Sequence, residues 1–144
     1  MIVREILKSK EAEGVFTVAP GTRVETAAAL LSEKRIGSVV ISADGKSFAG
    51  IISERDIVRE LGKRGPSCLA ETVDEMMTKE LETCELSDTA ESVLERMTLG
   101  RFRHMPVVEA GAMIGIITIG DVVKARLTEL SMEKDALEGM IMGF

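Results

Sequence analysis

The chain has few of the side chains on which most reactive sites and rigid cores depend. Its 144 residues include four Phe but no Trp or Tyr, two Cys and a single His. Packing must therefore rest on aliphatic side chains and on the nine Met. Cys68 and Cys84 form no C-x-x-C motif, and no metal-ligand spacing is present. This usage favours a reducing compartment over a disulfide scaffold.

Long apolar runs and an excess of positive charge are also missing. No run approaches the ~18 apolar residues that suggest a membrane span, and residues 1–7 lack the apolar core of a signal peptide. The net charge is −6, which argues against nucleic acid or an anionic membrane as the main partner. We therefore expect a soluble, cytoplasmic protein that binds neither nucleic acid nor membrane.

One pattern is present twice. Residues 50–56 read G-I-I-S-E-R-D and residues 115–121 read G-I-I-T-I-G-D. Their separation suits a small domain or half-domain rather than a solenoid repeat. Each copy is an apolar strand that runs into a hydroxyl residue, with an aspartate three positions later. Such a helix start can hold a phosphate and a sugar.

The repeat extends over most of the chain. Capping boxes at Thr22-x-x-Glu25 and Asp88-x-x-Glu91 predict two helix starts, and the first helix should end near Gly37. Residues 16–18 and 82–84 match each other and hold the first strand of each copy. The sequence then predicts the strands 38–41 and 50–53 and the helix 54–61 in the first copy. The second copy has the matching strands 104–108 and 115–118 and the helix 119–130. Residues 62–71 look like a linker.

These elements predict an α+β fold made of two pseudo-symmetric repeats. Each repeat would hold a small three-stranded sheet with flanking helices, and the two would share one core. Residues 1–66 form the first predicted repeat, residues 67–130 the second, and residues 131–144 a C-terminal helical tail. The stretch 122–141 can extend past the compact unit and pair with a second chain.

The order of these motifs resembles the cystathionine-β-synthase (CBS) domain pair, over roughly residues 3–130. The matching marks are Met76-Met77-Thr78, the two G-h-h-[ST]-x-x-D motifs, Gly37-Ser38, and Arg103-His104-Met105-Pro106-Val107-Val108. The resemblance implies a non-catalytic regulatory module that binds an adenosine-containing ligand in clefts between the repeats and requires no cofactor. Family ligands are AMP, ADP, ATP, S-adenosylmethionine and, in some members, NAD(H). It also implies a homodimer that relays ligand state to an effector protein.

Asp56 and Asp121 are the first candidate ligand residues. A carboxylate can accept hydrogen bonds from both hydroxyls of a ribose. The local sequence alone favours a second interpretation, because Ser53-x-x-Asp56 and Thr118-x-x-Asp121 are also capping boxes. Ser53 and Thr118 would lie at helix N-termini, which attract a phosphate. The resemblance favours ribose binding for at least one copy.

The two copies differ at the phosphate end. Arg55 can bind a phosphate through two N–H groups or lie on the surface as an ordinary arginine, and its counterpart is Gly120. The second copy has its own basic group at Arg101, Arg103 and His104. We expect these cations to converge on the phosphates, with His104 as a pH-sensitive contact or a structural residue. The two sites therefore need not hold the same ligand.

The adenine would lie against strand residues. The resemblance implies that the backbone at Thr17 and Thr83 hydrogen-bonds the adenine edge. Apolar residues that would contact the base are Val18, Val39, Ile51, Met105, Pro106 and Ile116, although the same residues also read as core positions. No nucleophile–base pair or phosphate-binding glycine loop is present, so we expect no enzymatic activity. The alternative function is a dimerisation or interaction module whose pockets stay empty.

Overall fold

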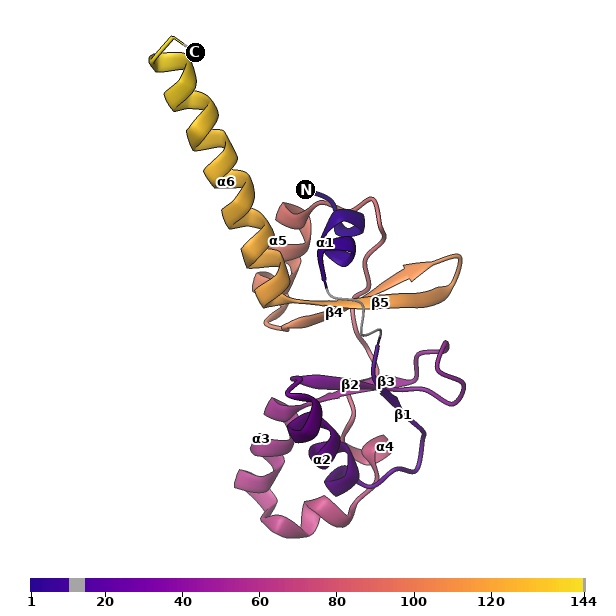
Figure 1. Cartoon of the computed structure of the whole chain (residues 1–144). Coiled ribbons are helices and arrows are strands. Elements are labelled where there is room, and N and C mark those ends of the chain that lie inside the picture. Colours follow the sequence, from indigo (N-terminus) through magenta and orange to yellow (C-terminus); the bar gives the residue numbers. More distant parts are fainter. Residues whose placement is uncertain (11–14, 144) are drawn as a thin grey trace. The chain divides into compact units, whose positions relative to one another are not determined.

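The computed structural model describes residues 1–10 and 15–143 (Figure 1). Their contacts divide them into two units whose sequences interleave. Residues 15–82 and 110–114 form the unit that contains Asp56, here called the Asp56 unit. Residues 1–10, 83–109 and 115–143 form the Asp121 unit.

A three-stranded sheet organises the Asp56 unit. Strand β2 (Ser38–Ile41) lies between β1 (Thr17–Val18), which is parallel to it, and β3 (Gly50–Ser53), which is antiparallel. The β-branched side chains of β2 and β3 favour extended backbone. The helices of this unit are α2 (Val24–Lys34), α3 (Glu54–Arg64), the 3-10 helix η1 (Pro66–Ala70) and α4 (Val73–Met76).

The Asp121 unit has a smaller sheet and the longest helix. Strand β4 (His104–Glu109) pairs with β5 (Ala112–Thr118), which belongs to this unit from residue 115 on, in a two-stranded sheet. Cys84 adds one parallel bridge to Val107, at the place that β1 has in the other unit. The helices are α1 (Val3–Ser9), α5 (Ala90–Gly100) and α6 (Ile119–Ile141). Helix α6 runs without a break through the predicted boundary at residue 130 and extends past the other helices of its unit (Figure 1).

The predicted fold class is confirmed, since the chain combines helices with two small sheets. Its buried apolar residues form two clusters, one in each unit, where the sequence predicts one core shared by both repeats. Ile52 in β3 and Ile117 in β5 occupy matching positions in these clusters, and both are fully buried. The second sheet has two strands and one bridge instead of three strands.

The short leading helices are exchanged between the repeats. Helix α1 packs in the Asp121 unit, and α4 packs in the Asp56 unit. Two backbone bridges fix this exchange, because Ile2 pairs with Thr89 and Arg23 pairs with Thr72. The compact units therefore differ from the sequence repeats, whose boundaries at residues 66 and 130 stay a prediction.

The same bridges displace the predicted capping boxes of α2 and α5 by one residue. Helix α2 has Arg23 rather than Thr22 as its N-cap, and α5 has Thr89, whose Oγ1 accepts a hydrogen bond from the Ser92 amide at 3.1 Å. The first amide of α2, from Val24, donates instead to the backbone carbonyl of Glu71 at 2.8 Å. Because a distant backbone satisfies this donor, no Thr22 side-chain cap is needed.

The predicted C-cap of α2, Gly37, lies two residues beyond the observed C-cap, Arg35. The helix ends at Lys34, and Arg35 takes the left-handed conformation with φ 54°. Arg101 does the same after α5, with φ 56°. A side chain in this region costs roughly 1–2 kcal/mol, so matching arginines there mark an unusual feature of both units.

The predicted linker at residues 62–71 is folded. Gly62 lies inside α3, which runs on to Arg64. Gly65 then turns the chain with φ 79°, and η1 places the fully buried Cys68 in the core of the Asp56 unit. The glycines and the proline that suggest a linker instead end one helix and begin another.

Candidate functional site

The start of α3 holds the Asp56 carboxylate within a capping box. The Ser53 hydroxyl accepts a hydrogen bond from the Asp56 amide at 3.2 Å, and Asp56 Oδ2 accepts bonds from the Ser53 amide and hydroxyl at 2.9 Å each. Arg59, one turn further along α3, donates to Asp56 Oδ1 at 3.2 Å. Asp56 is only 9% exposed. All of these partners belong to the strand–helix junction itself.

The start of α6 repeats the box with a different cation. Thr118 Oγ1 accepts from the Asp121 amide at 3.2 Å, and Asp121 Oδ2 accepts from the Thr118 amide at 2.9 Å. The cation is Lys10, which follows α1, and its Nζ lies 2.8 Å from Asp121 Oδ2. The same Nζ donates to the backbone carbonyl of Ile116 at 3.0 Å.

This environment lowers the pKa of the Asp121 carboxyl. Burial opposes ionisation and is the largest single effect, but the hydrogen bonds from Lys10 and Thr118 together outweigh it. Asp121 is therefore a carboxylate at neutral pH. An ionised carboxylate accepts hydrogen bonds without donating any, which suits two hydroxyl groups on adjacent carbons.

The strands that precede the two carboxylates, β3 and β5, also have different hydrogen-bond partners along their edges. In the Asp56 unit the backbone of Thr78 exchanges two hydrogen bonds with Ile51, at 2.9 and 3.0 Å. In the Asp121 unit the carbonyl of Ile116, which matches Ile51, accepts the bond from Lys10. A backbone bridge at one site is thus replaced by a charged side chain at the other.

The predicted phosphate-binding residues lie near these helix starts. Arg55 is exposed in the first turn of α3. In the Asp121 unit the exposed Arg103 and the half-buried His104 lead into β4, and the Arg103 carbonyl accepts the bond from the first amide of α6, that of Ile119, at 2.9 Å. Arg103, His104 and the start of α6 are therefore neighbours. The convergence of Arg55 with this group stays a prediction.

The residues predicted to contact adenine divide into two groups. Thr17 and Val18 are half-buried in β1, and Thr83 is exposed before the Cys84 bridge. Val39 and Met105, in contrast, are at most 1% exposed and belong to the two cores. The remaining candidates against the base are the buried Ile51 and Pro106 and the half-buried Ile116. The interpretation of several of these as core positions therefore holds.

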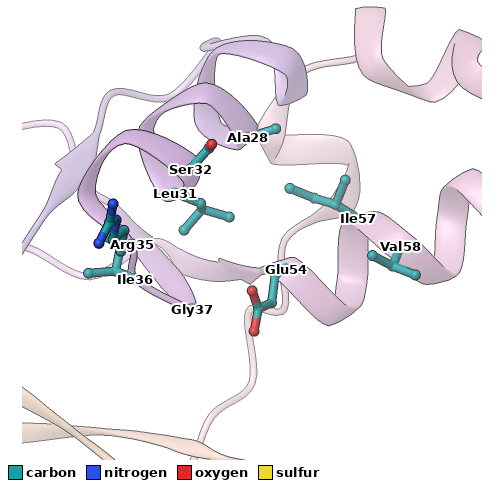
Figure 2. A pocket seen from close by; sticks show the side chains of 9 residues that line it. All are labelled: Ala28, Leu31, Ser32, Arg35, Ile36, Gly37, Glu54, Ile57 and Val58. Atoms are coloured by element: carbon teal, nitrogen blue, oxygen red, sulfur yellow. The ribbon is translucent and has the colours of Figure 1, made fainter.

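Sequence reasoning missed a pocket of about 490 Å3 in the Asp56 unit (Figure 2). It lies between the C-terminal half of α2 and the first turns of α3, and contains none of the predicted ligand residues. Arg35 and Glu54 contribute its charged groups, and Leu31, Ile57 and Val58 are among its apolar ones. The one signal in the sequence is Val58, an apolar residue on a polar helix, which is 67% exposed.

No helix within residues 1–10 and 15–143 is long and apolar enough to cross a membrane. Within the same ranges, no three His, Cys, Asp or Glu side chains gather in a way that could hold a metal ion.

Comparison with known proteins shows the family. The CBS domain family matches residues 3–63 and 73–128, so the chain belongs to the CBS domain family. The mitochondrial CBS domain-containing protein CBSX3 of Arabidopsis thaliana is 30% identical over 148 residues, which cover 98% of this chain and 72% of that protein.

Two solved structures extend the comparison. A CBS-domain containing protein from Agrobacterium tumefaciens is 40% identical and has a TM-score of 0.82. The match covers 88% of this chain and 99% of that protein's chain. CBSX2, whose structure is known in complex with AMP, is 29% identical in sequence and has a TM-score of 0.71. The match covers 88% of this chain and 96% of the CBSX2 chain. The pair of repeats thus extends over nearly the whole length of both structures.

Proposed function

We propose that the chain is a regulatory module that binds an adenine nucleotide at Asp56 and Asp121. The observation that carries this proposal is a matched pair of carboxylates, buried at Asp56 and half-buried at Asp121, each at the start of a helix that follows an apolar strand. The AMP bound to CBSX2, a protein of the same fold, supports the ligand class. In this proposal each carboxylate accepts hydrogen bonds from the ribose hydroxyls.

The phosphate is expected to lie at the N-terminal ends of α3 and α6. Helix N-termini carry partial positive charge and attract anions. Arg55 supplies a further cation in the Asp56 unit, and Arg103 and His104 supply them in the Asp121 unit. Thr17, Val18 and Thr83 would present backbone groups to the adenine edge.

We infer AMP as the main ligand, with ATP or NAD(H) as larger ones. The basis for two different ligands is the difference between Arg55 and Gly120, which alters the positive charge beside the phosphate. Binding would change the affinity for an effector protein without a catalytic step. Such coupling between two sites typically amounts to about 1–3 kcal/mol.

A homodimer formed through α6 is part of this proposal. Apolar side chains that are 40–85% exposed follow one another along this helix at spacings of three, four or seven residues. They are Val123, Leu127, Leu130, Leu137 and Ile141. This spacing is typical of a helix that pairs with another helix. Leu127→Glu should therefore shift the molecular mass measured by light scattering towards the monomer, whereas Thr128→Glu on the neighbouring face should not.

A cytoplasmic location agrees with the state of the cysteines. Cys68 and Cys84 are both buried and form no disulfide. Burial raises the pKa of the Cys84 thiol to about 12, so this group is unreactive at neutral pH. Both cysteines therefore suit a reducing compartment as packing residues.

The second candidate function is an interaction module without ligand. Its support is that both carboxylates already hold hydrogen bonds within the chain, while α6 leaves apolar side chains exposed. Thermal unfolding with AMP, ATP, NAD(H) or S-adenosylmethionine separates the two functions. A ligand at about 100 times its dissociation constant adds about 2.7 kcal/mol of stability. An unchanged melting temperature with all four ligands would favour the interaction module.

A further inference from the structure

The cation at Asp121 comes from a distant part of the chain. Lys10 is separated by 106 residues from Ile116, yet its Nζ contacts both the Ile116 carbonyl and the Asp121 carboxylate. The side chains of Lys10 and Asp121 are 33% and 23% exposed, so water screens the pair only in part. The Lys10 ammonium therefore contacts both sides of the strand–helix junction, the end of β5 and the start of α6.

The cation at the matching carboxylate is a local one. Asp56 receives its cation from Arg59, which lies on the same helix one turn away. The residue of α6 that corresponds to Arg59 is Lys124, and among the described residues its side chain forms no ion pair. The carboxylate of Asp121 is thus paired with a lysine from outside α6, although α6 has a lysine at the position that matches Arg59.

The position of Lys10 has a direct consequence for ligand binding. Its ammonium occupies Asp121 Oδ2, one of the two carboxylate oxygens that a ribose would use. A ribose that takes both oxygens must separate the ammonium from Asp121. Because charge-assisted hydrogen bonds are stronger than bonds between neutral groups, this exchange opposes ligand binding.

We propose that Lys10 determines the affinity of the Asp121 site by holding the ribose position until a ligand displaces it. The inference rests on the proposed function, since it concerns competition with a ribose. It makes the Asp56 site the first to fill, because the cation to be displaced there is Arg59, whose bond to the carboxylate is longer, at 3.2 Å, and whose side chain is 52% exposed. Ligand at Asp121 would in turn release the side chain of Lys10.

Titration calorimetry with adenosine tests this proposal. Adenosine carries no phosphate, so a changed lysine charge acts on it only through the ribose site. The Asp56→Asn substitution removes the carboxylate of the other site, so that binding is measured at the Asp121 site. In this background Lys10→Met, which keeps the length of the side chain, should strengthen adenosine binding about fivefold, the upper end of the energy range for a partly exposed ion pair. Lys124→Met is the matched control and should change the affinity less than about twofold.

Trypsin cleavage of the unmodified chain gives a second measurement that does not depend on a variant folding. Saturating adenosine should speed cleavage after Lys10, with cleavage after Lys8 as the internal reference. Unchanged or weaker binding by Lys10→Met, or slower or unaltered cleavage after Lys10, would overturn the Lys10 proposal alone. If the unmodified chain binds neither adenosine nor AMP, the proposed function itself fails, and the inference built on it fails with it.

Discussion

The helix starts at Asp56 and Asp121 use the same local motif but different partners. At Asp56 the contacts come from Ser53 and Arg59, all within one strand–helix junction. At Asp121 one contact comes from Lys10, on a separate segment. A sequence repeat therefore reproduces the local capping chemistry faithfully, whereas the charge that neutralises the carboxylate depends on how distant segments pack.

The largest expected effect tests whether the two units have equivalent cores. Ile52→Ala and Ile117→Ala each remove a fully buried side chain from matching strands. Each should lower the free energy of unfolding by about 2–5 kcal/mol, because a cavity is left in a packed cluster. Urea denaturation measures the loss. Ile114→Ala, at a position that is 43% exposed, is the control and should cost much less. A small loss for only one of the two core variants would break the equivalence.

The next effect concerns the two cations. Lys10→Met should lower the free energy of unfolding by up to about 1 kcal/mol, the usual range for a partly exposed ion pair. Arg59→Met should have little effect, because the Arg59 side chain is 52% exposed and its bond to Asp56 is longer. Urea denaturation compares the two variants. A larger loss of unfolding free energy for Arg59→Met than for Lys10→Met would contradict this difference between the two cations.

The pH dependence of stability should report the same ion pair. The folded-state pKa of Asp121 lies below its value in the unfolded chain, which is about 3.9. Its contribution is therefore fully present above that value and is lost as the pH falls through the folded pKa. Urea midpoints measured from pH 7 down to pH 3 should fall less steeply for Lys10→Met than for the unmodified chain. Identical slopes would show that Lys10 does not shift this pKa.

The smallest effect is expected at the left-handed arginines. Arg35→Gly and Arg101→Gly relieve the cost of a side chain at positive φ but increase the entropy of the unfolded chain. The net change should be a gain of at most about 1 kcal/mol in each unit. Melting temperatures would reveal this gain. A clear loss of stability in both variants would mean that the two arginine side chains make stabilising contacts in the folded protein.

The elements that the sequence predicts well are those set by local chemistry. The β-branched runs at residues 38–41 and 50–53 become strands, and Ser53 and Thr118 cap the helices that follow them. These features depend on neighbours within a few residues. The pattern of polar and apolar residues therefore contains enough information to place them.

The features that the sequence does not reveal depend on distant backbone. The bridge between Arg23 and Thr72 moves the start of α2 away from the predicted Thr22 cap. The Lys10 contact with Asp121 likewise joins segments that no local pattern connects. The exchange of α1 and α4 between the sequence repeats explains both results, since it brings the end of α1 to the start of α6 and the start of α4 to the start of α2.

The most direct test of nucleotide binding is calorimetric titration of AMP into the unmodified chain and into the Asp56→Asn, Asp121→Asn and doubly substituted chains. Asparagine keeps the shape of the side chain, and circular dichroism checks that each variant is folded. We predict that AMP binds the unmodified chain, that each single substitution weakens one site by at least about tenfold, and that the double substitution abolishes measurable binding. A folded double variant that binds AMP as tightly as the unmodified chain would contradict the assignment of both carboxylates.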